Sequence, residues 1–327
     1  MPFMIRPQFS RLAIAKLLVL LLLCPVILTC GQSPRNGVRL AGKRALRDPA
    51  GTKIVLLGTG TPNADPSRSG PSVAIVVDGT TYLVDSGPGI VRRAAAAEAM
   101  GVDALGVTEL GIVFLTHLHS DHTLGLADLI FSPWVLQREK PLEVYGPPGT
   151  TAMVDHLLEA YAEDVRVRID GLAPVNSTGY KVNTHEIHPG IAYQNESLKI
   201  EAFAVPHGAW RYAYGYRFET PHRTIVISGD TTPTESVVEN CTECDVLIHE
   251  VYSAHEFMDR PEEWQRYHAS AHTSTTELAA IATRAKPGLL ILYHQLFWGA
   301  DARDLLKEIR EGYPGRVVSG RDLEVYE

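Results

Sequence analysis

The segment from Thr116 to His122, which reads Thr-His-Leu-His-Ser-Asp-His, constrains this chain more than any other. The apolar residues 112–115 before it predict a buried strand, and residues 123–130 after it predict the start of a helix. The polar residues therefore lie on a loop at the carboxyl end of a strand. Three imidazoles and one carboxylate within six residues suit a borderline metal such as zinc. Because four ligands this close would crowd one ion, the spacing favours two ions; a metal-free, His-rich loop is the competing interpretation.

The pattern His117-x-His119-x-Asp121-His122 resembles the signature of the metallo-β-lactamase superfamily of metal-dependent hydrolases. Further segments resemble its ribonuclease Z-like branch, which also includes secreted arylsulfatase-like hydrolases. The resemblance runs from about Lys53 to the C-terminus. It implies one α/β domain over residues 52–327: a four-layer αββα sandwich with two packed sheets, helices outside, and ligands on loops at one edge.

The segments before the motif fit such a fold. Residues 53–57 predict a strand that ends in a Gly-rich turn, and residues 73–77 and 82–84 predict a hairpin about Asp78-Gly79. The turn after this hairpin starts at Asp85 and resembles the branch's Asp-x-Gly-Glu-Gly turn, with Pro88 in place of the Glu. By resemblance Asp85 orients metal ligands; a turn-capping carboxylate is the alternative.

The resemblance also supplies the ligands that lie outside the motif. His207 and His294 each follow a predicted strand, and Asp230 follows a strand and a Gly. Asp230 is expected to bridge two Zn²⁺ ions, although other divalent ions are compatible with these ligands. Two such ions hold a hydroxide near neutral pH and clamp an anionic ester, and Asp121 would aim that hydroxide. The expected ligands are His117, His119, His207 and Asp230 for one ion, and Asp121, His122, Asp230 and His294 for the other.

Two more residues resemble the branch's catalytic pair. Glu250 follows the predicted strand 246–248, and His272 precedes a predicted helix over residues 275–285. The resemblance places His272 beside the leaving oxygen as the acid, while Glu250 holds its tautomer and favours its charged form. A polar residue at a helix N-terminus is the alternative for His272. We place His249, His255 and His268 at the surface or behind the ligands.

Aromatic residues near the motifs are candidates for the wall of an apolar pocket that takes an aryl ester. For any single one of them, an ordinary core or surface position is the competing interpretation. These residues are Trp134, Trp210, Tyr212, Phe297 and Trp298.

Residues 1–30 predict a secretory signal, because Arg6, Arg11 and Lys16 precede a short apolar run over residues 17–28. The run is short for a membrane-spanning helix, although an uncleaved anchor is an alternative. Residues 27–31 resemble a bacterial lipobox, in which Cys30 would be lipidated; simple cleavage nearby is the other option. Residues 31–51 predict a linker. We expect an exported protein, either periplasmic or a membrane-anchored lipoprotein.

The net charge of the chain indicates which kinds of molecule it can bind. The chain has 30 Lys and Arg against 38 Asp and Glu, a net charge of −8, and residues 1–30 hold three of the basic groups and none of the acidic ones. The remainder is therefore more acidic still, which disfavours a polyanion. Ribonuclease Z proper grips tRNA with a basic, Gly-rich arm, and residues 137–200 hold no such block. We therefore expect a partner other than nucleic acid, and membrane contact only through the N-terminus.

The predicted function is that of an exported binuclear zinc hydrolase of small anionic esters, arylsulfatase-like and acting on a sulfate or phosphate ester. The enzyme alternative is a phosphodiesterase or a ribonuclease Z that cuts tRNA at its 3′ end. The non-enzyme alternative is a metal-binding envelope lipoprotein, against which Asp121, Glu250 and His272 argue. The oligomeric state stays open, with a homodimer as one option. Cys241 and Cys244 are expected to form a local disulfide in an oxidising compartment.

Overall fold

The computed structural model describes residues 51–327. The predicted signal, the lipidation site at Cys30 and nearly all of the predicted linker lie outside these residues. Among the residues described, no helix is both long and apolar enough to cross a membrane.

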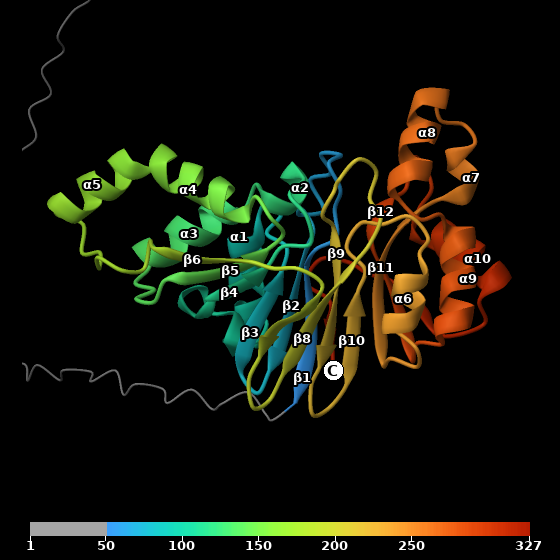
Figure 1. The fold of residues 1–327 in the computed structure, drawn as a ribbon, viewed down its shortest axis with the longest axis horizontal. Coiled ribbons are helices and arrows are strands. Elements are labelled where there is room, and N and C mark those ends of the chain that lie inside the picture. The colour runs from blue at the N-terminus through green and yellow to red at the C-terminus, as the bar shows by residue number, and fades with distance from the viewer. Residues whose placement is uncertain (1–50) are drawn as a thin grey trace, which may run out of the picture. The chain divides into compact units, whose positions relative to one another are not determined.

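Two seven-stranded sheets form the centre of this unit (Figure 1). In spatial order the first sheet contains β14 (Val325–Tyr326), β1 (Thr52–Gly58), β2 (Ser72–Val77), β3 (Thr80–Val84), β4 (Ile112–Phe114), β5 (Leu142–Gly146) and β6 (Val182–Glu186). The second contains β13 (Val317–Ser319), β12 (Leu289–Leu296), β11 (Val246–Tyr252), β10 (Thr224–Ile227), β9 (Tyr214–Glu219), β8 (Lys199–Ala204) and β7 (Gly190–Gln194).

Helices cover the outer faces of both sheets. On the first sheet lie α1 (Ile90–Ala99), α3 (Leu126–Val135) and part of α4 (Thr150–Ala160). On the second lie α6 (Glu235–Asn240), α9 (Thr275–Ala285) and α10 (Ala302–Gly312). The remaining helices are α2 (Ser120–Thr123), α5 (Ala162–Asp170), α7 (Ala254–Phe257), α8 (Glu262–Ala271) and the short 3₁₀ turns η1 (Asp103–Leu105) and η2 (Val107–Glu109). The predicted four-layer αββα sandwich is confirmed.

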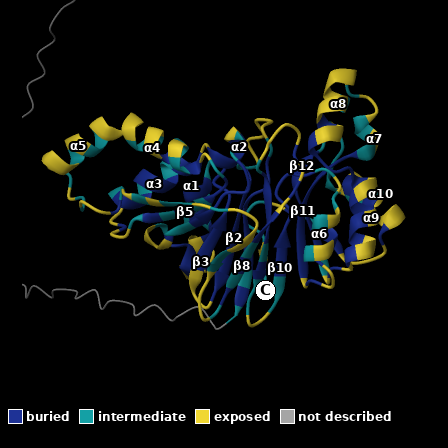
Figure 2. Ribbon diagram, viewed as in Figure 1, coloured by how far each residue is buried: buried dark blue, intermediate teal, exposed yellow. Residues whose placement is uncertain are grey.

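The central strands are apolar on both faces because each sheet is covered there on both sides. In β1, Val55 and Leu57 pack under the helices of the first sheet, while Ile54 and Leu56 pack between the two sheets. The predicted hairpin is present between β2 and β3, and both of its central residues, Asp78 and Gly79, have a positive φ. Figure 2 shows the central strands of both sheets largely buried, in dark blue.

The helix after the His motif differs from the prediction. One helical turn, α2, begins at Ser120 inside the motif, and α3 begins only at Leu126. The break falls at Gly125, whose N–H donates to the carbonyl of Ser86 at 2.8 Å. A Cβ on Gly125 would lie 2.3 Å from the carbonyl oxygen of Gly87, so only glycine fits this crossing. The turn directs Asp121 and His122 into the interior, where both are buried.

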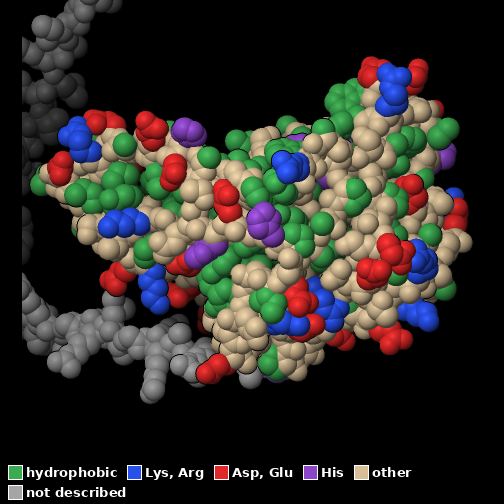
Figure 3. Space-filling view, in the orientation of Figure 1, with side chains coloured by type: hydrophobic (Ala, Val, Ile, Leu, Met, Phe, Trp, Pro, Cys, Tyr) green, Lys and Arg blue, Asp and Glu red, His purple; other side chains and the backbone are tan. Residues whose placement is uncertain are grey.

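Helices α4 and α5 form an extension from the first sheet, which we call the α4–α5 arm (residues 150–170; Figure 1). No residue of α5 is buried, and Figure 2 shows both helices largely exposed. The arm follows the His motif as a tRNA-gripping arm would, but its composition is acidic: five Asp and Glu side chains oppose Arg166 and Arg168. On the face shown in Figure 3, basic side chains lie scattered among acidic ones without a continuous basic patch.

Cys241 and Cys244 follow α6, and a disulfide joins their buried side chains, as predicted. The bridge lies under α9, in the core on the outer face of the second sheet.

Candidate dinuclear metal centre

The predicted ligands meet at one edge of the two sheets because of strand direction. β4 is parallel to its neighbours β3 and β5, and β10, β11 and β12 are parallel to one another. β8 runs the same way as β10, since both pair antiparallel with β9 between them. The carboxyl ends of these strands therefore share an edge. The His motif follows β4, His207 follows β8, Asp230 follows β10, and His294 lies near the end of β12.

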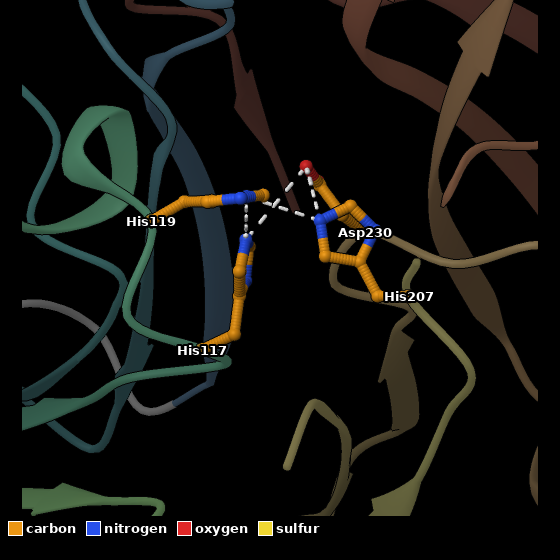
Figure 4. A group of neighbouring side chains, drawn as sticks. All are labelled: His117, His119, His207 and Asp230. Carbon is orange, nitrogen blue, oxygen red and sulfur yellow. Dashed lines mark hydrogen bonds and ion pairs between the residues drawn. The ribbon is translucent and has the colours of Figure 1, made fainter. Parts of the chain in front are cut away.

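The first cluster contains His117, His119, His207 and Asp230, whose ligating atoms all lie within 4.8 Å of one another (Figure 4). His119 Nδ1 lies 2.9 Å from His117 Nε2 and 3.1 Å from His207 Nε2. Asp230 Oδ2 lies 4.0 Å from the Nε2 atoms of both His117 and His207. A tetrahedral metal with bonds of ~2.0–2.1 Å separates its ligand atoms by roughly 3.3 Å, so this cluster is close to that size.

The second cluster contains Asp121, His122 and His294, and Asp230 connects it to the first. Asp121 Oδ2 lies 3.5 Å from His122 Nε2 and 3.2 Å from His294 Nε2. Asp230 Oδ2 lies 3.3 Å from His122 Nε2 and 3.5 Å from His294 Nε2. One carboxylate oxygen is thus directed at both clusters, as a bridging ligand requires. The structure brings all seven predicted ligands together.

Three buried polar atoms in these clusters have no hydrogen-bond partner, namely His122 Nε2, Asp230 Oδ1 and His294 Nδ1. Such atoms cost free energy unless something satisfies them. A cation at each cluster would give His122 Nε2 a partner, would offset the charge of Asp230 and would separate the crowded ring nitrogens. The side chains therefore fit a binuclear metal site made of nitrogen and oxygen ligands.

Neighbouring groups fix the ligand rings in the orientation that metal binding needs. Asp85 Oδ2 lies 2.8 Å from His122 Nδ1 and also accepts a hydrogen bond from the hydroxyl of Thr116. That hydroxyl lies 2.9 Å from His117 Nδ1, and His207 Nδ1 lies 2.6 Å from the carbonyl oxygen of Ala271. In each ring Nε2 is left for the cluster. Asp85 therefore orients ligands, in addition to ending the hairpin.

Burial and charge set the protonation of the ligands. Burial lowers the pKa of His117 well below its usual value and that of His119 to about 4, so both rings are neutral, the form that binds metals. Burial opposes a charge on His122 too, but the carboxylates of Asp230, Asp85 and Asp121 raise its pKa well above the usual value. The same contacts keep Asp230 ionised: His294 and His122 hold its pKa well below the usual range despite its burial.

The predicted catalytic pair lies beside the clusters. His272 Nδ1 lies 3.3 Å from Glu250 Oε2 and 4.0 Å from Asp230 Oδ2. Glu250 is held in place because its Oε1 accepts the backbone N–H of Thr273 at 2.8 Å. Burial lowers the pKa of His272 to about 4 and, with help from Asp230, raises that of Glu250 well above its usual value. The pairing is therefore as predicted, but burial favours a neutral pair over the expected charged imidazole.

A cavity of about 600 Å³ opens over both clusters. At its deep end lie His119, Asp121, Asp230, His272 and His294. Its outer wall consists of Arg260, Trp264, Tyr267, His268 and Trp298, together with Pro62, Asn63, Glu263 and Leu296. A substrate ester that enters this cavity therefore meets these side chains beside the clusters.

The cavity corrects part of the prediction about aromatic residues. Of the five named candidates, Trp298 lines it, whereas Trp134 is fully buried in the core of the first sheet. Trp210 lines a smaller adjoining hollow, where its indole N–H donates to His119 Nε2 at 2.7 Å. Trp264, Tyr267 and His268 line the cavity and were missed. The signal was the spacing of these three residues along one helix face.

The fold and the paired clusters together define a metal-dependent hydrolase. Residues 80–295 match the family model described as "Beta-lactamase superfamily domain". Ribonuclease Z of Mycobacterium marinum is 36% identical over 277 residues, which cover 83% of this chain and 96% of that protein. The chain belongs to the metallo-β-lactamase superfamily, in its ribonuclease Z-like group.

Solved structures show the same fold. The metallo-β-lactamase fold protein YhfI from Bacillus subtilis has a TM-score of 0.64 at 19% identity, covering 85% of this chain and 100% of its own. The short form of human tRNase Z has a TM-score of 0.62 at 22% identity, covering 84% of this chain and 98% of its own. These likenesses concern the fold alone.

Proposed function

We propose that this chain is a binuclear zinc phosphodiesterase that cleaves RNA in the manner of ribonuclease Z. The observation that carries the proposal is one cavity that holds both ligand clusters and the His272–Glu250 pair, in a chain 36% identical to a ribonuclease Z. The relatives favour this alternative over the arylsulfatase-like interpretation, and an RNA over a small anionic ester as the partner. Zinc is proposed because imidazole and carboxylate ligands suit it.

The mechanism assigns a separate task to each side chain. The two ligand clusters would hold two divalent ions, which would supply Lewis acidity and make water easier to ionise near neutral pH. Asp121 lines the cavity beside His294 and orients the attacking water by accepting its hydrogen bond. His272 faces Glu250 through Nδ1. In the neutral pair Glu250 carries a proton, which can pass to Nδ1 as Nε2 gives its own proton to the departing oxygen. Glu250, fixed by the N–H of Thr273, holds that ring in place.

A second candidate, a small phosphodiester such as a dinucleotide, is favoured by the charge distribution. The α4–α5 arm is acidic, and Arg260 is the one Lys or Arg among the residues that line the cavity. A long polyanion needs several basic contacts, whereas a dinucleotide needs few. The chemistry at the metal centre is the same for both substrates.

A substrate panel separates these candidates. We expect the zinc-loaded protein to release the 3′ trailer from a tRNA precursor, with a rate that falls steeply as salt rises because phosphate contacts weaken. The panel also contains a dinucleotide, a nitrophenyl phosphodiester and nitrophenyl sulfate, and His119→Ala serves as the inactive control. Cleavage of the dinucleotide with an intact precursor would favour the second candidate. Turnover of the sulfate alone would restore the arylsulfatase-like interpretation.

We also propose export, on the basis of residues 1–30. The mature chain should begin at or near Cys30, and lipidation of that residue should place the protein in the membrane fraction. Cys30→Ser should then move it to the soluble fraction, with Cys24→Ser as the matched control. N-terminal sequencing and fractionation measure both outcomes. Membrane association that survives Cys30→Ser would indicate an uncleaved anchor, and an intact N-terminus in a soluble protein would contradict export.

A further inference from the structure

The outer wall of the cavity presents an aromatic surface that the proposed chemistry does not use. Trp264, Tyr267, His268 and Ala271 occupy positions i, i+3, i+4 and i+7 of α8 and therefore share one face of that helix. Such a stripe normally packs onto a core, yet only His268 and Ala271 are buried in α8. Trp264 remains 47% exposed and Tyr267 41% exposed. Both rings line the cavity rather than the sandwich.

Trp298 completes this surface from the loop after β12. Its ring centroid lies 4.6 Å from that of His268, which lies 5.7 Å from that of Trp264 and parallel to it within 24°. The guanidinium of Arg260 lies over the Trp298 ring at 5.3 Å, which places a cation at the margin of the aromatic wall. In Figure 3 hydrophobic side chains lie along α8, while charged side chains occupy its tip.

The aromatic surface is continuous with the metal centre. The Tyr267 and His268 rings lie 6.2 Å and 5.4 Å from the His272 ring, and Asp230 lies 4.0 Å beyond His272 Nδ1. Suppose that the phosphorus atom of a substrate lies at the ligand clusters. A flat ring that is joined to this phosphorus through one sugar would then reach Trp264 and Tyr267. Aromatic faces bind bases by stacking, which is strong and tolerant of sequence.

We propose that Trp264, Tyr267 and Trp298 form an aromatic clamp that stacks on a flat ring attached to the scissile phosphoester. The ring is a nucleobase or an aryl group, and Arg260 meets an anionic oxygen beside it. This inference rests on the proposed function for the position of the phosphoester. It adds that a ring next to the scissile bond contributes most of the substrate preference.

Equilibrium binding tests the clamp without requiring turnover. The zinc-loaded protein is titrated with adenosine 5′-monophosphate and with ribose 5-phosphate, and in a second pair with phenyl phosphate and with methyl phosphate. In at least one pair, we expect the compound that carries an aromatic ring to bind about tenfold more tightly, as stacking of one such ring predicts. A preference in the first pair alone identifies a nucleobase; a preference in both identifies any flat ring.

Substitutions at Trp264 assign the preference to the clamp. Trp264→Leu keeps an apolar side chain but loses the ring, so it should reduce the tenfold preference to about twofold and leave ribose 5-phosphate binding unchanged. Trp264→Phe should keep most of the preference. Tyr161→Leu is the matched control, since Tyr161 is 43% exposed on the α4–α5 arm. Zinc content should be the same in all variants.

Two results would overturn the clamp. One is equal binding, by the wild-type protein, of phosphates with and without an aromatic ring, and the other is a full preference for the aromatic compound in Trp264→Leu. The proposed function fails by a different result, which is the absence of phosphodiester cleavage in a protein that still prefers ringed phosphates.

Discussion

Asp230→Asn should lower the metal content from two ions per chain to one or none, and should reduce hydrolysis by at least about 10²–10³-fold. Asp230 Oδ2 lies between 3.3 and 4.0 Å from nitrogen atoms of five histidines, which belong to both clusters and to the catalytic pair. An asparagine amide carries no negative charge and cannot bridge two cations. Elemental analysis of the purified protein measures the metal, and any phosphodiester measures the rate.

Two further substitutions distinguish the loss of a bridging metal ligand from a general disturbance of the fold. Asp85→Asn removes only the group that orients His122 and, through Thr116, His117. It should weaken metal affinity by the ~10–100-fold typical of a supporting group, with both ions restored in excess zinc. Asp155→Asn on the α4–α5 arm should change neither quantity. Two tightly bound ions in folded Asp230→Asn would contradict the bridging role.

His272→Ala should slow the cleavage of alkyl and nucleoside phosphoesters by about 10²–10⁴-fold while leaving the metal content unchanged. Negative charge develops on the departing oxygen, and a positioned acid contributes most when that oxygen is basic. Nitrophenolate leaves without help, so nitrophenyl esters should be slowed far less. Glu250→Gln should show the same trend more weakly, because it disturbs the ring only through the 3.3 Å contact.

A plot of the rate against the pKa of the leaving group is the measurement, with a steeper slope expected for His272→Ala than for the wild-type enzyme. His255→Ala is a suitable control, since that side chain is 79% exposed. An equal loss for all leaving groups would mean that His272 stabilises charge on the transferred phosphoryl group. His272 would then not be the proton donor.

The predicted strands and the ligands of the His motif rest on local signals, which explains why the structure matches them, whereas the other ligands were predicted from the resemblance. A continuous apolar run such as residues 54–57 marks a strand covered on both faces, wherever the covering helices come from. Likewise, a polar group directly after a buried strand lies at that strand's carboxyl edge. His207 and Asp230 follow this rule, and His294 lies within β12 near its carboxyl end, so all three meet the motif there.

The errors arose where a residue's role depends on a partner far away in the chain. Trp134 and Trp298 both stand near motifs, yet one is in the core and the other lines the cavity. The helix break at Gly125 depends on the backbone of residues 86–87, which no local pattern around residue 125 contains. The sequence shows that the α4–α5 arm is acidic. That the arm extends away from the sheet depends on the direction in which α4 leaves β5, which the sequence does not show.

The sequence by itself predicted the strands, through runs of apolar residues, and the ligands of the His motif, through their spacing. The sandwich and the ligands outside the motif were predicted from the resemblance to the superfamily. Only the tertiary structure decided which groups face the substrate. The neutral state that burial imposes on His272 and Glu250, and the stripe of Trp264, Tyr267 and His268 along the cavity, depend on how α8 stands relative to β12. Burial and proximity come from packing between distant segments, so a local pattern does not contain them.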